Sequence, residues 1–338
     1  MSQVGILGAG SWGTALAKVL GDAGHRVALW SHSPLVADQI RNKRENSEYL
    51  PGAKLPETVS VSVDLATTLS DAEFVVAVVP SHAFREVIER AVPYVPRDAI
   101  IFTATKGIEV DTLKRPSEIV TELLQNDRPP GMLSGPSFAL EVAEGDPTAI
   151  VVASSDRDVA DRAQELFSTD RFRVYTNDDI LGVELAGALK NVIALAAGIA
   201  DGLGYRHNSR AALITRGLAE ITRLGVSMGA RPTTFAGLAG LGDVILTATA
   251  DMSRNRHVGL RIGQGESLEA ILSGMRMVAE GVRTTAAARR LAELHAVEMP
   301  IVEETHAILF DNKPPEQATA DLMLREPKPE HWGTADAP

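Results

Sequence analysis

The 338-residue sequence predicts an α/β protein, in which a doubly wound N-terminal domain is followed by an all-helical C-terminal domain. Two observations carry this prediction. In the first half, short apolar runs with the length of buried strands alternate with segments of helical periodicity. After residue 177 the strand-like runs stop and only helical periodicity continues. We therefore expect residues 1–178 and residues 179–338 to form two domains, each long enough to bury its own core.

The elements of the first domain follow from apolar runs bounded by glycine, proline and polar residues. Strands are predicted at residues 3–7, 26–30, 74–79, 99–105, 131–135, 148–154 and 172–177. Helical patterns after the strands include residues 82–92, 116–125 and 136–145, with Pro136 in the first turn of the last of these. This alternation favours a mainly parallel sheet, in which ligands bind beyond the carboxyl ends of the strands.

The second domain is predicted to contain helices alone. Their expected ranges are residues 179–203, 208–228, 233–238, 243–250, 267–273, 283–295, 300–309 and 315–325. The segment that begins at Glu326 is rich in proline and polar residues, and we expect it to be a loose tail.

A glycine-rich segment follows the first predicted strand and begins the first helix. Gly8, Gly10 and Gly13 match the G-x-G-x-x-G pattern, with strand, turn, helix and second strand in order. The first glycine permits the tight turn, the second lets a pyrophosphate approach the backbone, and the third lets the helix pack against the strand. The helix N-terminus supplies N–H groups and the positive end of the helix dipole. A Rossmann-type dinucleotide site is favoured over a glycine turn that merely packs.

The end of the second strand bears on which dinucleotide is bound. An NAD site usually has Asp or Glu there for the ribose hydroxyls, but this chain reads Trp30-Ser31-His32-Ser33. A 2′-phosphate would meet no repulsion, and His32, the two serines, Arg41, Lys43 and Arg44 could hold it. We therefore expect NADP or NAD, with NADP favoured. The alternative for His32 is an ordinary surface histidine.

Composition and charge exclude several classes of function. The formal net charge of −11 argues against non-specific nucleic-acid binding, which needs many phosphates to be neutralised. The chain has no cysteine, which excludes disulfides and thiolate chemistry, and the histidines lack metal-ligand spacing. Charged and polar residues interrupt the longest apolar stretch, so we expect no membrane insertion. No leader pattern precedes the first strand, and a cytoplasmic location is the default expectation.

Lys190 stands in an apolar helical run, "GALKNVIALAAG", in which no residue three or four positions away can pair with its ammonium. One interpretation is that the lysine snorkels outward from a packed helix. The other is that it faces an interdomain cleft, where partial burial lowers its pKa and lets it exchange a proton near neutral pH. Asn191 beside it could orient a substrate or a water.

Polar residues gather at two further places. Ser81, Lys106, Gly135 and Ser137 follow the ends of predicted strands, although Lys106 could also be a solvated loop lysine. In the second domain, Asp243 is either a helix N-cap or an acid that binds or tunes Lys190. The run from Ser253 to His257 is either a solvated charged segment or a phosphate site, since arginine binds phosphate through two parallel hydrogen bonds.

Together these segments resemble the bacterial-type NAD(P)-dependent glycerol-3-phosphate dehydrogenases over nearly the whole chain. The resemblance rests on "GAGSWGTALA", "NSEYLPG", "TKGIE", "SGPSFALEV", "ELAGALKNVIALAAGIADGLG", "GLAGLGDVILTATADMSRNRHVG" and "VAEGV". It implies a Rossmann domain joined to a helical substrate domain, and interconversion of dihydroxyacetone phosphate and sn-glycerol 3-phosphate for phospholipid synthesis. Relatives are often homodimers, and many have arginine around positions 32 and 33.

The resemblance also implies residue roles. Lys190 is the expected active-site lysine, with Asp243 tuning it and Asn191 beside it. Substrate contacts are implied for Lys106, Gly135, Ser137, Asp243, Ser253, Arg254 and Asn255. Cofactor contacts are implied for Ser11, Trp12, His32, Lys106, Ala139, Arg254, Val278 and Glu280. Two rival functions remain: a dehydrogenase for another hydroxy acid or a ketopantoate-like substrate, and a non-enzymatic NADP sensor.

Overall fold

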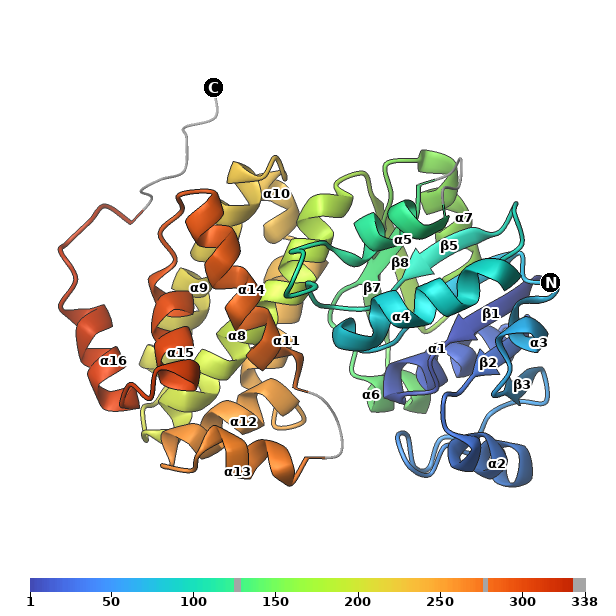
Figure 1. The fold of residues 1–338 in the computed structure, drawn as a ribbon, viewed down its shortest axis with the longest axis horizontal. Coiled ribbons are helices and arrows are strands. Elements are labelled where there is room, and N and C mark those ends of the chain that lie inside the picture. Colours follow the sequence, from blue (N-terminus) through green and yellow to red (C-terminus); the bar gives the residue numbers. More distant parts are fainter. Residues whose placement is uncertain (125–128, 276–278, 331–338) are drawn as a thin grey trace. The chain divides into compact units, whose positions relative to one another are not determined.

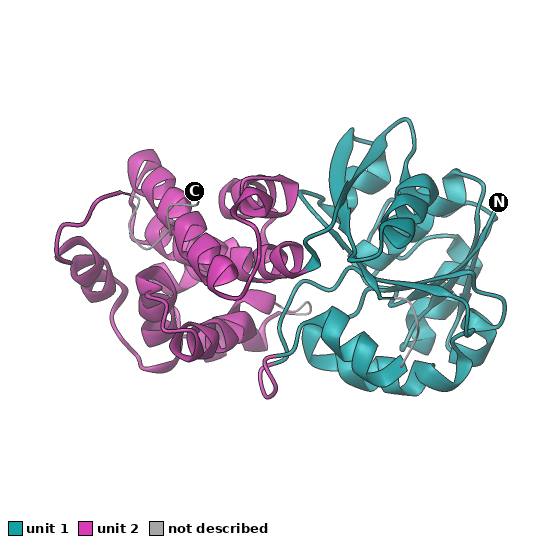
Figure 2. Ribbon diagram, turned by 90° about the horizontal axis from the view of Figure 1, so that it is seen from above, with its two compact units in different colours: residues 1–109, 114–180 teal, residues 110–113, 181–338 magenta. Residues whose placement is uncertain are grey.

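The computed structural model describes residues 1–124, 129–275 and 279–330 (Figure 1). The chain forms two compact units, coloured separately in Figure 2: residues 1–109 with 114–180, and residues 110–113 with 181–338. Residues 110–113 were expected in the first domain, but they cluster with the second unit, where the Arg290 guanidinium donates to the Val110 carbonyl.

The first unit is built on one eight-stranded sheet with the strand order β3-β2-β1-β4-β5-β6-β7-β8. Neighbouring strands are parallel except for the β6–β7 pair, which is antiparallel. The strands are β1 (Gln3–Leu7), β2 (Arg26–Trp30), β3 (Val59–Ser62), β4 (Phe74–Ala77), β5 (Ile100–Thr103), β6 (Gly131–Ser134), β7 (Thr148–Ala153) and β8 (Phe172–Asn177). Strand β3 was not predicted, because this edge strand has a "VSVS" pattern that lacks a continuous apolar run.

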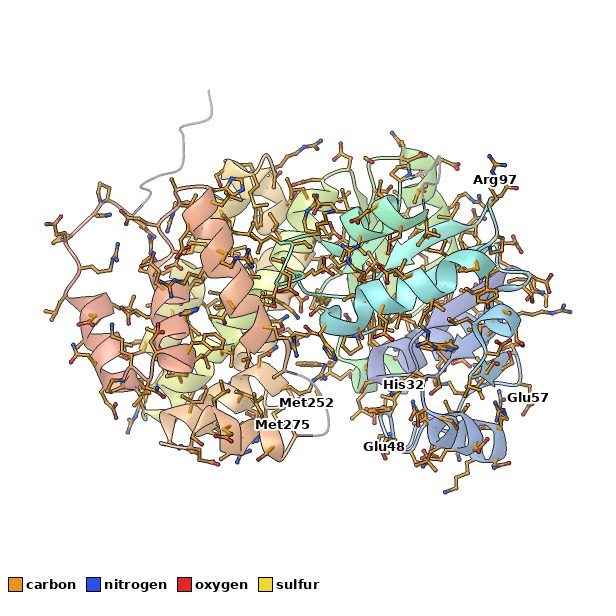
Figure 3. The ribbon with its side chains drawn as sticks, in the orientation of Figure 1. His32, Glu48, Glu57, Arg97, Met252 and Met275 are labelled. Carbon is orange, nitrogen blue, oxygen red and sulfur yellow. The ribbon has the colours of Figure 1, made fainter. Side chains whose placement is uncertain are left out.

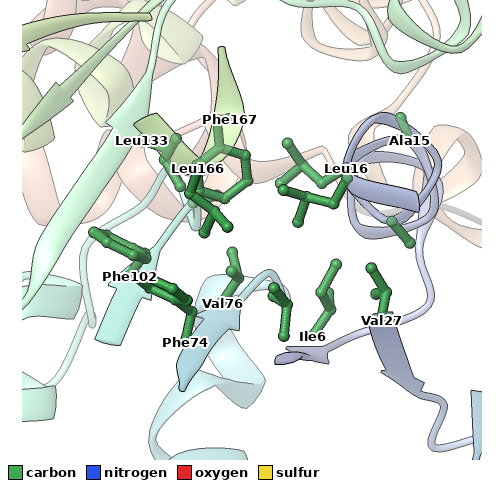
Figure 4. Close-up of a cluster of buried hydrophobic side chains, with 14 of the residues drawn as sticks. Ile6, Ala15, Leu16, Val27, Phe74, Val76, Phe102, Leu133, Leu166 and Phe167 are labelled. Atoms are coloured by element: carbon green, nitrogen blue, oxygen red, sulfur yellow. The ribbon is translucent and has the colours of Figure 1, made fainter. Parts of the chain in front are cut away.

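Helices cover both faces of this sheet. One face packs against α1 (Ser11–Asp22), α2 (Pro34–Lys43), α6 (Ala139–Glu144) and α7 (Arg157–Phe167), and Figure 4 shows part of that core. The other face packs against α3 (Leu65–Leu69), α4 (Ser81–Ala91) and α5 (Pro116–Leu124). Helices α2, α3 and α7 were not predicted, because they are short or carry many polar residues. The doubly wound prediction is confirmed.

Three aromatic rings of the first face pack against one another (Figure 4). Phe102 stacks on Phe74 with 6.2 Å between ring centroids and meets Phe167 edge-on at 6.1 Å. These three side chains come from β5, β4 and α7, so the core ties two neighbouring strands to a helix. The loops that follow the carboxyl ends of these strands are the predicted ligand positions.

All the regular secondary structure in the described part of the second unit is helical, as predicted. Its elements are α8 (Ile180–Gly202), α9 (His207–Ser227), α10 (Pro232–Phe235), the π-helix η2 (Leu238–Gly242), α11 (Asp243–Thr249), α12 (Arg254–Gly263), α13 (Leu268–Ser273), α14 (Glu280–Leu294), α15 (Pro300–Phe310) and α16 (Pro315–Met323). The sequence analysis missed α12, since its polar first turn resembles a charged loop.

The long helix α8 is the centre of this unit. By length and hydropathy it is the one single helix of the described chain that could cross a membrane, but 89% of its apolar window is buried inside the protein. A helix that is apolar on every face and surrounded by other helices is typical of a protein core. Residues 182–200 of α8 are all buried, including Lys190.

Helices α8 and α12 approach each other closely through glycines. A Cβ added at Gly198 would overlap the carbonyl oxygen of Arg256, and one at Gly259 would overlap that of Leu195. Backbone therefore packs against backbone, which sets the position of α12 relative to the helix that carries Lys190.

The start of the C-terminal segment is held to this unit. Lys328 and Arg325 both pair with the carboxylate of Glu298, and Arg216 donates to the carbonyl of Glu330 at 2.9 Å. Residues 326–330 are exposed and form no helix or strand, as expected of a tail, although Lys328 and Glu330 contact this unit; residues 331–338 lie outside the described part.

Candidate active site

The glycine-rich turn between β1 and α1 has the geometry that the motif predicts. Gly8 has a φ of +124°, and an added Cβ would lie 2.5 Å from the carbonyl oxygen of Val78. A Cβ at Gly13 would overlap the carbonyl oxygen of Gly8. The turn and the close helix–strand contact therefore both need glycine.

The N-terminus of α1 has features that fit a dinucleotide. Its N-cap is Gly10, which supplies no side-chain cap, and an added Cβ at Gly10 would meet nothing within 4 Å. The indole Nε1 of Trp12, in the first turn, is buried without a hydrogen-bond partner in the described structure. These features suit a bound anion. The helix start offers backbone N–H groups, the space beside Gly10 is open, and the Trp12 indole N–H is a further donor. The Ser11 hydroxyl, in contrast, donates to the Tyr49 carbonyl at 2.7 Å.

At the end of β2, most of the side chains expected around a 2′-phosphate have other partners. Ser31 is buried and donates to the Ser33 carbonyl, while the Ser33 hydroxyl caps α2. Arg44 donates to the carbonyls of Leu55 and Pro56. Ser31, Ser33 and Arg44 thus form local contacts in this conformation, and their role in phosphate binding stays a prediction.

His32 differs from those residues because its side chain is exposed at the surface of the first unit (Figure 3). Arg41, which we also expected near a 2′-phosphate, pairs with Asp38 at 2.6 Å. His32 is thus the better candidate for a contact at this strand end, and no acid follows β2 within the next three residues.

Three predicted residues meet at the ends of β5 and β6. The ammonium of Lys106 and the hydroxyl of Ser137 both donate to the Gly135 carbonyl, at 2.9 and 3.0 Å. Lys106 is therefore held in place and does not behave as a freely solvated loop lysine. The following helix α6 begins at Ala139, with Phe138 as N-cap, so the expected helix start at Pro136 is wrong.

Lys190 is buried on α8, with 7% of its surface exposed, and its partners come from another helix. Its Nζ donates to Asp243 Oδ1 at 2.5 Å and to Thr247 Oγ1 at 2.8 Å. Asp243 and Thr247 lie one turn apart on α11, so both side chains leave the same helix face. The interpretation of Lys190 as a snorkelling surface lysine is wrong, and the expected Lys190–Asp243 pair is confirmed.

The sequence analysis did not identify Thr247. Its spacing of four residues from Asp243 on one predicted helix was the available signal. Asp243 is the first residue of α11 and not its N-cap, which is Gly242. The N-cap alternative for Asp243 is therefore wrong.

A second polar chain runs from α8 to α14. Asn255 Nδ2 donates to Asn191 Oδ1 at 2.9 Å, and the Gly281 N–H donates to Asn255 Oδ1 at 2.9 Å. Asn191 and Asn255 are both buried. This chain links the residue after Lys190 to the first turns of α12 and α14.

The first turn of α12 presents a cation. Ser253 is the N-cap and accepts from the Arg256 N–H at 3.2 Å, while Arg254 follows at the first helical position. Desolvation lowers the pKa of Arg254 from its ordinary value, and the nearby carboxylate of Glu280 partly opposes this shift. Arg256 is a poorer candidate for binding a phosphate, because its guanidinium pairs with Asp201 and Asp251. Val278, expected to contact the cofactor, lies outside the described residues.

No group of three or more metal-ligating side chains occurs in the described part of the chain. A Rossmann-type unit joined to a helical unit with a buried, acid-paired lysine defines the class of two-domain dinucleotide-dependent dehydrogenases.

Comparison with known proteins narrows this class. Residues 3–160 match the model of the NAD-dependent glycerol-3-phosphate dehydrogenase N-terminus, and residues 179–320 match that of its C-terminus. The chain belongs to this family of enzymes.

Individual relatives are similar over nearly their whole length. The glycerol-3-phosphate dehydrogenase [NAD(P)+] of Citrifermentans bemidjiense is 54% identical over 330 residues, which cover 97% of this chain and 98% of the relative. That of Bacillus velezensis is 50% identical, covering 96% and 95%. The crystal structure of glycerol-3-phosphate dehydrogenase from Coxiella burnetii matches with a TM-score of 0.92 at 42% identity, covering 96% of this chain and 99% of that one.

Proposed function

We propose that the protein interconverts dihydroxyacetone phosphate and sn-glycerol 3-phosphate with NAD(P)H, and so supplies glycerol 3-phosphate for phospholipid synthesis. The observation that supports the proposed proton transfer is the buried Lys190, which Asp243 and Thr247 hold in place. The family supplies the substrate pair, because the named relatives are glycerol-3-phosphate dehydrogenases over nearly their full length.

Lys190 is the proposed proton donor and acceptor. A bound nicotinamide supplies the hydride that reduces the ketone carbon. As negative charge develops on the carbonyl oxygen, the Lys190 ammonium stabilises it and then donates a proton to that oxygen. In the reverse direction, neutral Lys190 accepts the proton from the hydroxyl. Asp243 and Thr247 hold Nζ in one position, so that the proton transfer needs little rearrangement.

The phosphate of the substrate is assigned to the start of α12. Arg254 is the cation there, and Ser253 and Asn255 flank it. Asn191 and Asn255 are already joined by a hydrogen bond, so we propose that they orient the substrate as a pair. Lys106, Gly135 and Ser137 remain proposed ligand contacts on the first unit, and Ser11, Trp12, His32, Ala139 and Glu280 remain proposed cofactor contacts.

NADPH is the proposed preferred cofactor. The absence of an acid after β2 and the exposed His32 support this preference. We also propose a cytoplasmic location and a homodimer, on the strength of the family alone. Light scattering on the purified protein tests the dimer.

The test of the function follows the absorbance of NADPH, and separately of NADH, with dihydroxyacetone phosphate or with unphosphorylated dihydroxyacetone. We expect fast oxidation that depends on the phosphate, and a faster rate with NADPH. Folded protein that oxidises neither cofactor would contradict the proposal and favour a nucleotide sensor. Equal rates with both ketones would remove the phosphate assignment.

Arg254→Ala sharpens the phosphate assignment. We expect the KM for dihydroxyacetone phosphate to rise about 10-fold to 100-fold, because charged hydrogen bonds to the phosphate are lost. Arg261→Ala is the matched control, since Arg261 lies in the last turn of the same helix and pairs with Glu266, which follows that helix. An unchanged KM in the Arg254 variant would show that the phosphate binds elsewhere.

A further inference from the structure

The segment Asn46–Leu50 belongs to "NSEYLPG", one of the resembling segments, yet the proposed mechanism gives it no role. Asn46 is fully buried, with 0% of its surface exposed. Its Nδ2 donates to the Ala9 carbonyl at 2.9 Å and to Thr14 Oγ1 at 2.8 Å, and its Oδ1 accepts from the Tyr49 N–H at 3.1 Å. Both amide N–H groups and the amide oxygen are thus used.

The bond to Ala9 constrains the middle of the glycine-rich turn. The Ala9 carbonyl and the Gly10 N–H belong to the same peptide unit, and in a trans peptide they point in opposite directions. The described chain has no cis peptide. Because Asn46 holds the carbonyl, the Gly10 N–H points away from Asn46, and the carbonyl dipole cannot rotate toward an anion at the start of α1.

A second contact strengthens this arrangement. The Ser11 hydroxyl donates to the Tyr49 carbonyl at 2.7 Å, and the Leu50 N–H donates to the Asn46 carbonyl at 2.8 Å. The segment Asn46–Leu50 therefore contacts Ala9 in the glycine-rich turn, and Ser11 and Thr14 in the first turn of α1. These contacts lie beside Gly10, where an added Cβ would meet only open space.

We propose that Asn46 is a positioning residue for dinucleotide binding, which holds the peptide between Ala9 and Gly10 in the orientation that accepts a pyrophosphate. The inference rests on the proposed function, since it presumes a dinucleotide at this turn. Asn46 acts through the backbone and does not contact the ligand. Its loss weakens nucleotide binding and leaves the proton transfer at Lys190 intact.

The test compares three variants. Asn46→Ala removes both donors and the acceptor. Asn46→Asp keeps the shape and the acceptor for the Tyr49 N–H, but places an oxygen where Nδ2 faced the Ala9 carbonyl. Ser47→Ala is the matched control, because Ser47 is the next residue and its hydroxyl donates to the Glu45 carboxylate, away from the glycine-rich turn. For each variant, calorimetry gives the Kd of NADPH, denaturation without nucleotide gives stability, and kinetics give kcat at saturating NADPH.

We expect the Kd of NADPH to rise about 10-fold or more in both Asn46 variants, with kcat at saturation within about threefold of wild type. Ser47→Ala is expected to bind as wild type. If Asn46→Ala does not fold, the Asn46→Asp variant provides the same comparison. Folded Asn46→Asp with wild-type Kd overturns this inference alone, as does an equal loss in Ser47→Ala. A wild-type protein that binds neither NADPH nor NADH overturns the proposed function and the inference with it.

Discussion

The two units build their proposed sites in different ways. The glycine-rich turn of the first unit uses backbone: a run of glycines, the start of α1 and the peptide held by Asn46, contributed by residues 8–14 and one neighbouring loop. The second unit uses side chains from four helices, with Lys190 on α8, Asp243 on α11, Arg254 on α12 and Glu280 on α14. A backbone site depends on local conformation, whereas a side-chain site depends on how the helices pack.

This difference determines which substitutions matter. In the first unit, nucleotide binding is most sensitive to an added methyl group, because the methyl group obstructs the approach of the phosphates to the backbone. In the second unit the sensitive changes are removal of a charge and displacement of a helix, because each alters where the functional groups lie.

Lys190→Ala is the substitution with the largest expected effect. We expect kcat to fall about 10²-fold to 10⁴-fold, because the proton donor is lost, while the Kd of NADPH stays close to wild type. Lys313→Ala is the control, since Lys313 pairs with Glu304 and Asp321 on the surface. Because Lys190→Ala leaves Asp243 buried without its cation, Lys190→Met with Asp243→Asn is measured alongside it. Near-normal turnover in a folded variant would remove Lys190 from the mechanism.

Gly259→Ala tests the helix packing behind the side-chain site. The new Cβ would overlap the Leu195 carbonyl oxygen, so α12 must move away from α8. We expect the unfolding free energy to fall by about 2–4 kcal/mol, measured by urea denaturation. At Gly274 an added Cβ would lie 3.7 Å from its nearest neighbour, so Gly274→Ala is expected to be nearly neutral. Similar stability of the two variants would contradict the close approach of α8 and α12.

Glu220→Gln tests a buried acid in the second unit. Glu220 on α9 accepts from the N–H groups of Ile301 and Val302 at the start of α15. Burial raises its pKa from 4.5 to about 8, against the opposing effects of these N–H groups and of Arg223. The folded state therefore binds a proton that the unfolded state releases between these values, and stability falls as pH rises from about 4.5 to about 8.

We expect the wild-type unfolding free energy to fall by about 2 kcal/mol relative to Glu220→Gln between pH 5.5 and 7.5. Urea denaturation of both proteins across this pH range measures the difference between their unfolding free energies. Groups other than Glu220 titrate in both proteins, so their contributions cancel in this difference. Parallel pH profiles for the two proteins would show that Glu220 is ionised in the folded state throughout.

Gly10→Ala has the smallest expected effect and addresses the backbone site. The backbone at Gly10 has a φ of −80°, which alanine adopts, and its Cβ would meet nothing within 4 Å. We expect stability without nucleotide to be unchanged, but the Kd of NADPH to rise about tenfold, because the methyl group occupies the approach of the phosphates. Gly13→Ala is the contrast, since it should lower stability as well. A wild-type Kd in Gly10→Ala would place the dinucleotide away from this turn.

The prediction from sequence was good where the determinants are contiguous. The glycine turn, seven of the eight strands and most of the helices were identified because each has its own periodicity or spacing. The edge strand β3 and helix α12 were not, since burial of their few apolar residues depends on neighbours distant in the chain. Similarly, the sequence separated Lys190 from Thr247 by 57 positions, and only the fold shows that they meet.

The sequence by itself determined the doubly wound architecture, the position of the glycine-rich turn and the presence of a lysine in an apolar helix whose neighbouring turns offer it no partner. These follow from local steric and hydrophobic patterns, which act over a few residues. The tertiary structure alone decided that Thr247 joins Asp243 as a partner of Lys190, that Ser31, Ser33 and Arg44 form local contacts, and that Asn46 holds Ala9. The reason is physical: a buried polar group must find a partner, and packing decides which one lies within reach.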